Sequence, residues 1–167
     1  ITKYDISNPV DLPLYFSVGA HPGFRCPLEE HETFEDYYLE FDSDKFDLSS
    51  LIEGLRDKTK KTISLENKRI PLTTELFDND ALVFENKQID SVSLCSSKSS
   101  HKITMQCHDW PYFGIWTKKS CRDFICLEPW YGIADRIDSS QELSEKDGII
   151  RLEPKKSFSC TFDLDFE

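Results

Sequence analysis

The chain has 167 residues, 13% of them aromatic, and its 31 acidic and 20 basic side chains give a formal net charge of -11. This length is sufficient for one domain with a hydrophobic core. So acidic a chain should repel nucleic acids and anionic membranes, and we expect neither as a partner. No apolar run approaches the roughly 20 residues of a membrane span, and no secretory signal is recognisable.

The first residues indicate that the chain is a piece of something longer. Residue 1 is isoleucine, and the single methionine is Met105. The first strand-like run, "ITKYDIS", has no preceding hairpin that would cover its edge. Because an uncovered edge invites pairing with other chains, we expect strands that belong before residue 1.

Strand-like patterns occupy most of the sequence. Residues 157–166, "SFSCTFDLDF", alternate apolar with small or acidic side chains, which is the period of a strand with one buried face. Similar apolar, β-branched or aromatic runs cover 1–7, 37–41, 80–85, 91–95, 101–107, 113–117 and 123–128. Turn-like stretches such as "SNPVDLP" and "HDWP" separate them.

Helical composition is confined to two short segments, residues 73–80 and 135–147, and residues 42–71 form an excursion or a hairpin. There is no internal repeat and no linker. Many short strands separated by turns predict an all-β fold, an antiparallel β-sandwich or barrel, with residues 1–167 in one domain.

The six cysteines lie outside any CxxC spacing, and several fall in strand-like runs; they are Cys26, Cys95, Cys107, Cys121, Cys126 and Cys160. Three disulfide bonds are possible in a secreted protein, but buried free thiols in the cytoplasm are the favoured interpretation. Because histidines and cysteines are scattered along the chain, the sequence predicts no metal site.

His21 is the first candidate catalytic residue. It lies in "SVGAHPGF", where Pro22 favours an extended backbone before it, and Gly19 and Gly23 permit tight turning or close approach of a ligand. A histidine held in this way suits proton transfer near neutral pH. A histidine that only completes the turn is the structural alternative.

Glu128 is the second candidate, because it ends the buried run "FICL" and precedes Pro129, Trp130 and Tyr131. A carboxyl group placed against aromatic rings is costly unless it is paired or used, and burial raises its pKa towards that of a useful base. The alternative is a structural carboxylate held by backbone amides or by Arg136.

Three further side chains can contribute to a binding surface. Asp80 lies directly before an apolar run. It either binds hydroxyl groups of a ligand or serves only as a turn residue. Trp116 and Trp130 supply aromatic surface for the apolar face of a sugar, or belong to the core.

Together, His21 and Glu128 are expected to face each other across a small polar ligand. No nucleophile motif and no phosphate-binding glycine loop is present.

Four stretches, in this order, resemble the aldose 1-epimerase (galactose mutarotase) family: "FSVGAHPGFRCPL", "LFDNDALVFEN", "FGIWT" and "FICLEPWYGIADR". Within that family the sequence is most similar to the LacX-like branch of bacteria, which residues 142–166 also resemble. The resemblance implies a large antiparallel β-sandwich about twice this length, with this chain as its C-terminal part. It also implies a further active-site histidine and an arginine in an N-terminal half. That N-terminal half and a second copy of the chain are the two expected protein partners.

The resemblance further implies an isomerase of carbohydrate metabolism that interconverts the α and β anomers of a free hexose. Glu128 is then the base at the anomeric hydroxyl, His21 the acid at the ring oxygen, and Asp80 the hydroxyl-binding aspartate. No cofactor or metal is required. A branch of the superfamily acts on hexose 6-phosphates, for which Arg25 and Arg136 are candidate phosphate ligands. A sugar-binding sandwich without catalysis and a fragment that needs an N-terminal partner chain are the alternatives.

Overall fold

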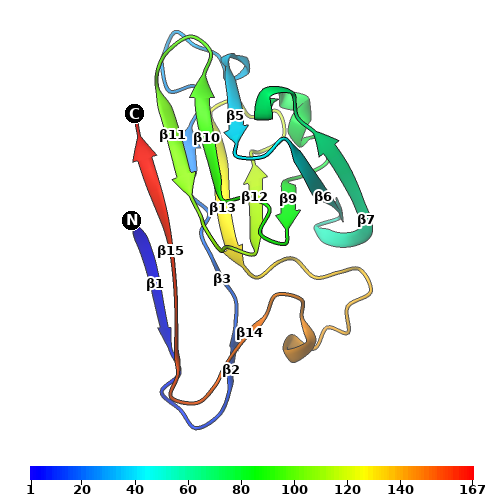
Figure 1. Cartoon of the computed structure of the whole chain (residues 1–167). Helices are drawn as coiled ribbons and strands as arrows, with labels where there is room; N and C mark the ends of the chain where they lie inside the picture. The colour runs from blue at the N-terminus through cyan, green and yellow to red at the C-terminus, as the bar shows by residue number, and fades with distance from the viewer.

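The computed structural model describes residues 1–167, and almost all of its regular structure is antiparallel β-sheet (Figure 1). The strands are β1 (Thr2–Ser7), β2 (Leu14–Phe16), β3 (Val18–Gly19), β4 (Gly23–Arg25), β5 (Tyr37–Phe41), β6 (Lys45–Ile52), β7 (Leu55–Ser64), β8 (Arg69–Pro71), β9 (Leu82–Glu85), β10 (Ser91–Ser96), β11 (Lys102–Gln106), β12 (Tyr112–Trp116), β13 (Phe124–Tyr131), β14 (Ile150–Leu152) and β15 (Ser157–Phe166). Four short 3-10 helices connect them: η1 (Phe34–Asp36), η2 (Glu66–Lys68), η3 (Thr74–Phe77) and η4 (Leu143–Glu145).

Two large sheets contain most of these strands. One has the order β1-β15-β11-β10-β5-β8, and the other has the order β3-β13-β12-β9-β6-β7, with β4 also paired to β13. β14 and β2 form a separate two-stranded ribbon, visible at the bottom of Figure 1. The predicted antiparallel all-β fold is confirmed.

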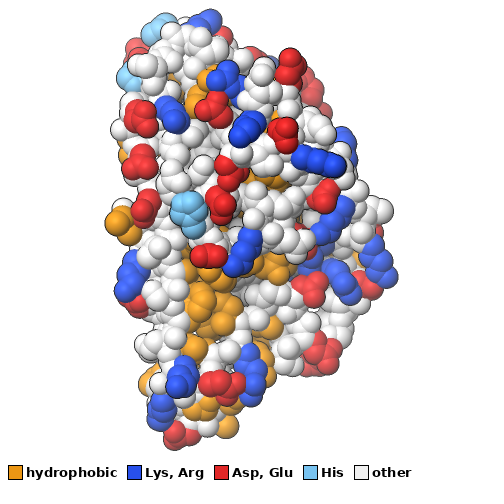
Figure 2. Space-filling view, viewed as in Figure 1, with side chains coloured by type: hydrophobic (Ala, Val, Ile, Leu, Met, Phe, Trp, Pro, Cys, Tyr) orange, Lys and Arg blue, Asp and Glu red, His pale blue; other side chains and the backbone are white.

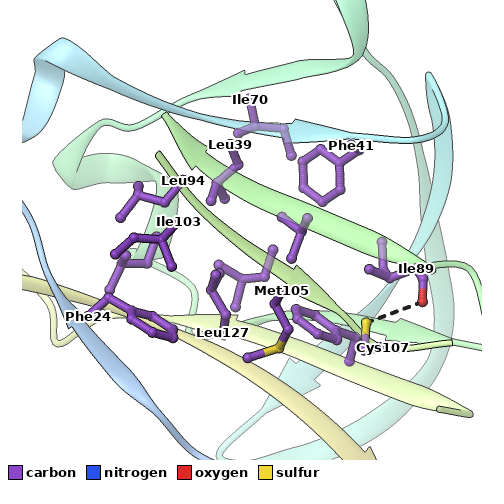
Figure 3. Packing of buried hydrophobic residues seen from close by; sticks show 14 of the residues in the cluster. Phe24, Leu39, Phe41, Ile70, Ile89, Leu94, Ile103, Met105, Cys107 and Leu127 are labelled. Carbon is purple, nitrogen blue, oxygen red and sulfur yellow. Dashed lines mark hydrogen bonds between the residues drawn. The ribbon is translucent and has the colours of Figure 1, made fainter. Parts of the chain in front are cut away.

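A cluster of 25 buried residues fills the space between the two large sheets. Leu39, Leu94 and Met105 reach into it from the first sheet, and Ile115 and Leu127 from the second. Figure 3 shows these packed layers of side chains, which include Cys107 with its sulfur 3.6 Å from the carbonyl oxygen of Ile89. Because apolar side chains from both inner faces interdigitate here, the architecture is a β-sandwich.

The strand-like runs of the sequence correspond closely to strands of the structure. The uncertain region 42–71 contains the long hairpin β6–β7, whose pairing runs from Lys45 with Ser64 to Ile52 with Leu55. The two segments of helical composition contain only the 3-10 helices η3 and η4. β1 pairs on one side with β15 and lies at the edge of its sheet.

All six cysteines are free thiols, and five of them are buried, while Cys121 is only partly buried. The prediction of free thiols is confirmed, and that of burial holds for all except Cys121. Acidic and basic side chains are interspersed over much of the face in Figure 2, and hydrophobic side chains gather in its lower half. None of the helices combines the length and the apolar character needed to cross a membrane.

Candidate active site

The alternation of side chains along β13 separates the core from the candidate site. Ile125 and Leu127 point into the hydrophobic core, so their neighbours Cys126, Glu128 and Trp130 share the opposite face of the strand. β12 continues this pattern, because Phe113 and Ile115 are core residues and Gly114 and Trp116 lie between and beyond them. The outer face of the second sheet therefore carries the candidate site.

The loop that holds His21 lies against the same strand. β3 and β4, which flank this loop, both pair with β13. Two backbone hydrogen bonds secure it between these strands: the Ala20 amide donates to the Pro129 carbonyl at 3.0 Å, and the Leu127 amide donates to the Pro22 carbonyl at 3.2 Å. Residues more than 100 positions apart in the sequence thus become neighbours.

His21 and Glu128 are in direct contact. The His21 Nε2 atom lies 3.2 Å from the Glu128 Oε1 atom, and the His21 side chain is 61% exposed whereas that of Glu128 is 4% exposed. The expectation that the two would face each other across a ligand is therefore replaced by a touching pair. Both side chains line the same pocket.

Burial is the main cause of the raised pKa of the Glu128 carboxyl group. Removal from water raises the pKa of its carboxyl group to about 7, although the positive charge of His21 and a hydrogen bond from Trp130 oppose the increase. A carboxyl group with this pKa is ionised in a large fraction of molecules at neutral pH and also accepts a proton readily. These are the properties of a general base or acid.

A pocket of about 530 Å³ opens beside this pair, within the range of small-molecule sites. Five of the sequence-predicted residues line it, namely His21, Asp80, Trp116, Glu128 and Trp130. Its apolar walls come from residues that the sequence did not single out, among them Val18, Leu51, Val83, Tyr131 and Ile133. The pocket therefore combines a few polar groups with aromatic and aliphatic surface.

The Trp130 ring packs against two glycines. A methyl group at Gly19 would lie 2.7 Å from Trp130 Cδ1, and one at Gly114 would overlap the six-membered part of the ring. The indole consequently lies directly on the backbones of β3 and β12. The sequence carried a signal for this arrangement, because Gly114 interrupts an otherwise bulky strand, and such glycines mark close approach.

Asp80 reaches the pocket from the loop before β9 in an unusual backbone conformation. Its φ of 78° lies in the left-handed region, and its Oδ1 atom accepts a hydrogen bond of 2.7 Å from the Ala81 amide. Aspartate is one of the residue types that adopt this conformation most readily, and the chain uses it at several other turns. The side chain is exposed and lines the pocket.

The structure does not bring Arg25 or Arg136 to this pocket. Arg25 pairs with Phe124, four residues before Glu128 along β13, which corresponds to roughly 13 Å of strand. Arg136 lines a different hollow and forms ion pairs with Asp138 at 3.2 Å and Asp147 at 3.8 Å. The pocket has no lysine or arginine in its lining.

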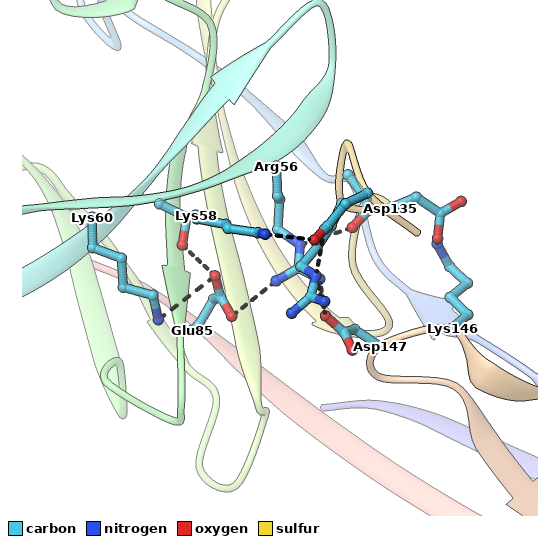
Figure 4. A network of polar contacts seen from close by, with 11 residues as sticks. Arg56, Lys58, Lys60, Glu85, Asp135, Lys146 and Asp147 are labelled. Atoms are coloured by element: carbon cyan, nitrogen blue, oxygen red, sulfur yellow. Dashed lines mark hydrogen bonds and ion pairs between the residues drawn. The ribbon is translucent and has the colours of Figure 1, made fainter. Parts of the chain in front are cut away.

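A buried arginine lies in the middle of a network of polar contacts (Figure 4). Arg56, 5% exposed, donates to Glu85 at 3.1 Å, to Asp147 at 2.7 Å and to the Ala134 carbonyl at 2.8 Å. These contacts join the β6–β7 hairpin to the segment after β13, and each contributes pocket residues, such as Leu51 and Ala134. Sequence reasoning missed this network.

Cys126 is a further residue that the sequence did not place here. Its sulfur, the His21 nitrogen and a Glu128 oxygen all lie within 4.8 Å of one another. Burial and the charge of Glu128 raise the pKa of this thiol to about 11. The two-residue spacing from Glu128 on a strand was the available signal. Scattered positions in the sequence thus converge into a set of possible metal ligands.

Several known proteins are similar to this chain. No family model matches the chain. The LacX proteins of Lactococcus lactis subsp. lactis, chromosomal and plasmid-encoded, are each 33% identical over 168 residues, covering 98% of this chain and 56% of LacX. A galactose mutarotase-related enzyme from Lactobacillus acidophilus is 31% identical, with a TM-score of 0.91 over 99% of this chain and 56% of that structure. This chain is similar to the LacX proteins and to a galactose mutarotase-related structure.

This chain spans little more than half the length of the proteins it matches. A galactose mutarotase-like protein from Lactobacillus casei shares the fold, with a TM-score of 0.83 at 24% identity over 99% of this chain and 58% of that one. The resemblance to LacX-like, galactose mutarotase-related proteins and the antiparallel β-sheet fold are therefore confirmed. The roles of individual residues in the LacX-like chain remain predictions.

Proposed function

We propose that this LacX-like chain carries the acid–base pair of an aldose 1-epimerase, an isomerase that interconverts the anomers of a free hexose. The observation that carries the proposal is the 3.2 Å contact between His21 and Glu128 at a pocket of about 530 Å³. The names of relatives, which include a galactose mutarotase-related enzyme, point to the same chemistry. In this proposal residues 1–167 act as one domain in the cytoplasm, where free thiols persist.

The proposed reaction needs two proton transfers at oxygens bonded to one carbon. Ionised Glu128 takes the proton of the anomeric hydroxyl, and protonated His21 gives a proton to the ring oxygen. The bond between the anomeric carbon and the ring oxygen breaks, and a carbonyl group forms. Rotation of the carbonyl group and the reverse proton transfers close the ring as the other anomer.

The direct contact of acid and base fits this geometry. The hydroxyl oxygen and the ring oxygen share the anomeric carbon, so the groups that serve them must also be close together. His21 and Glu128 satisfy this requirement on the same side of the pocket. Each such group typically contributes about 10²–10⁴-fold to the rate.

The lining of the pocket supports a neutral hexose as the substrate. Trp116 and Trp130 offer aromatic surface to the apolar face of the ring, and Asp80 offers a carboxylate to hydroxyl groups. The described residues around the pocket include two acids and no lysine or arginine, which disfavours a phosphate group. We therefore propose free hexoses over hexose phosphates.

Polarimetry of freshly dissolved α-glucose and α-galactose tests the proposal. The chain is expected to speed equilibration over buffer, and His21→Ala is expected to slow the catalysed part by at least about 10²-fold. His101→Ala, which removes an exposed histidine of another ion pair, is the matched control and should leave the rate unchanged. No acceleration by the unmodified chain would contradict the proposal, and saturable sugar binding by calorimetry in that case would indicate the sugar-binding alternative.

A further inference from the structure

We propose that His21, Cys126 and Glu128 form a binding site for a zinc ion. The three side chains supply an imidazole nitrogen, a thiol sulfur and a carboxylate oxygen, which are the ligand types of zinc sites in proteins. They come from the loop between β3 and β4 and from alternate positions of β13. The proton-transfer chemistry proposed above uses only two of them and gives Cys126 no role.

The distances agree with a tetrahedral site. Bonds of 2.0–2.3 Å from zinc to nitrogen, oxygen and sulfur place neighbouring ligand atoms roughly 3.3–3.8 Å apart. His21 and Glu128 already lie 3.2 Å apart, and all three atoms lie within 4.8 Å of one another. The His21 side chain is 61% exposed and can rotate, so a small movement brings the three atoms to one ion.

The charges also balance. Zinc binding expels the thiol proton of Cys126, and any proton held by Glu128 or His21, to solvent, and the ion binds the thiolate, the carboxylate and the neutral imidazole. A thiolate and a carboxylate together carry two negative charges, which offset the two positive charges of the ion. The resulting complex is neutral and suits a site in which Cys126 is 3% and Glu128 is 3% exposed.

The fourth coordination position faces the pocket. Glu128 and His21 both line the pocket, so an ion bound between them is open to water or to a sugar hydroxyl on that side. Three protein ligands with one open position characterise zinc sites that exchange ligands. The bound ion also occupies both members of the proposed acid–base pair, and zinc therefore inhibits that reaction.

Cobalt substitution tests the site without any measurement of activity. The chain is first treated with a chelator, which is then removed, and Co²⁺ is added. One Co²⁺ per chain with a near-ultraviolet thiolate-to-cobalt charge-transfer band is expected, and Zn²⁺ should displace it. Cys126→Ser should abolish the band, whereas Cys160→Ser, which changes another buried thiol, should retain it.

His21→Ala keeps the test decisive if Cys126→Ser does not fold, because His21 is exposed and its removal leaves the core intact. This variant is expected to weaken Co²⁺ binding about tenfold or more, and His108→Ala, an exposed histidine elsewhere, should not weaken it. Absence of the charge-transfer band in the unmodified chain would overturn the site. A band that survives in Cys126→Ser, or affinity unchanged in His21→Ala, would do the same.

Inhibition is a second arm that rests on the proposed function. Zn²⁺ should slow sugar equilibration with the same half-saturation as its binding, and a chelator should restore the rate. Binding of the metal by a chain without epimerase activity would overturn the proposed function and leave the zinc site standing. Activity that Zn²⁺ does not affect, together with no cobalt band, would overturn the zinc site only.

Discussion

The Glu128 side chain is almost completely buried, at 4% exposed, and it contacts His21 at 3.2 Å. Desolvation raises the pKa of its carboxyl group to about 7, despite the opposing effects of His21 and of the hydrogen bond from Trp130. In the proposed mechanism only the ionised carboxylate acts as the base. The rate of sugar equilibration is therefore expected to fall about tenfold per pH unit below about 7, measured by polarimetry with a chelator present. A rate that stays constant down to pH 5 would contradict this assignment.

The same pKa has an opposite consequence for stability. Between pH 4.5 and about 7 the unfolded chain releases the proton of Glu128 while the folded chain retains it, so the free energy of unfolding falls as the pH rises. Glu128→Gln removes this loss. The effect of the substitution on the free energy of unfolding should therefore be more favourable at pH 8 than at pH 4 by about 1–3 kcal/mol. Urea denaturation at both pH values measures the difference. Glu30→Gln, at an exposed position, should show no such change, and equal behaviour of the two variants would refute the prediction.

Local sequence context was sufficient to single out His21 and Glu128, because each lies in a short stretch whose glycine, proline and aromatic neighbours are unusual. It did not single out Cys126, although this residue lies two positions before Glu128 on the same face of β13. The spacing of the cysteines to one another carries no information about other ligands. Their distance to His21 depends on the pairing of β4 with β13, which the sequence does not display.

At the scale of the strand, the site depends on a glycine in β12 that leaves room for a tryptophan of β13. Gly114 lies beneath the ring of Trp130, and a methyl group there would overlap that ring. Gly114→Ala should therefore displace Trp130, destabilise the chain by about 1–3 kcal/mol and weaken sugar binding. Urea denaturation and calorimetry measure the two effects. In a Trp130→Ala background, Gly114→Ala should lower the free energy of unfolding far less. An equal loss in both backgrounds would show that overlap with the Trp130 ring is not the cause.

The strands themselves were largely predictable, because alternating apolar residues with turns between them specify the elements of a sandwich. The hairpin β6–β7 was ambiguous, since Leu55–Ser64 is mostly exposed and contains three lysines, and such a strand has only a weak hydrophobic signal. Its position is set by pairing of β6 with β9 and by Arg56. These are long-range contacts, which a local pattern cannot reveal.

At the scale of the molecule, the Arg56 network holds together parts of the chain that are about 80 residues apart. Removal of this side chain leaves Glu85 without its buried cationic partner, and Arg56→Ala should lower the free energy of unfolding by about 3–5 kcal/mol. Lys58→Ala breaks the exposed ion pair with Asp138 and should cost at most about 1 kcal/mol. Equal urea midpoints for the two variants would contradict this account.

The whole-molecule arrangement also explains which site predictions failed to converge. Arg25 and Arg136 are close in sequence to His21 and Glu128, but strand direction and surface ion pairing place them elsewhere. Asp80, Trp116 and Trp130 come from three different segments and nevertheless line one pocket.

The most direct test of the proposed acid–base pair is the rate of anomer exchange at equilibrium, measured by NMR saturation transfer on glucose. The unmodified chain is expected to raise this rate above that of buffer. Glu128→Gln should reduce the catalysed rate by at least about 10²-fold, while Glu30→Gln leaves it unchanged. Exchange in Glu128→Gln as fast as in the unmodified chain would contradict the assignment of Glu128 as the base.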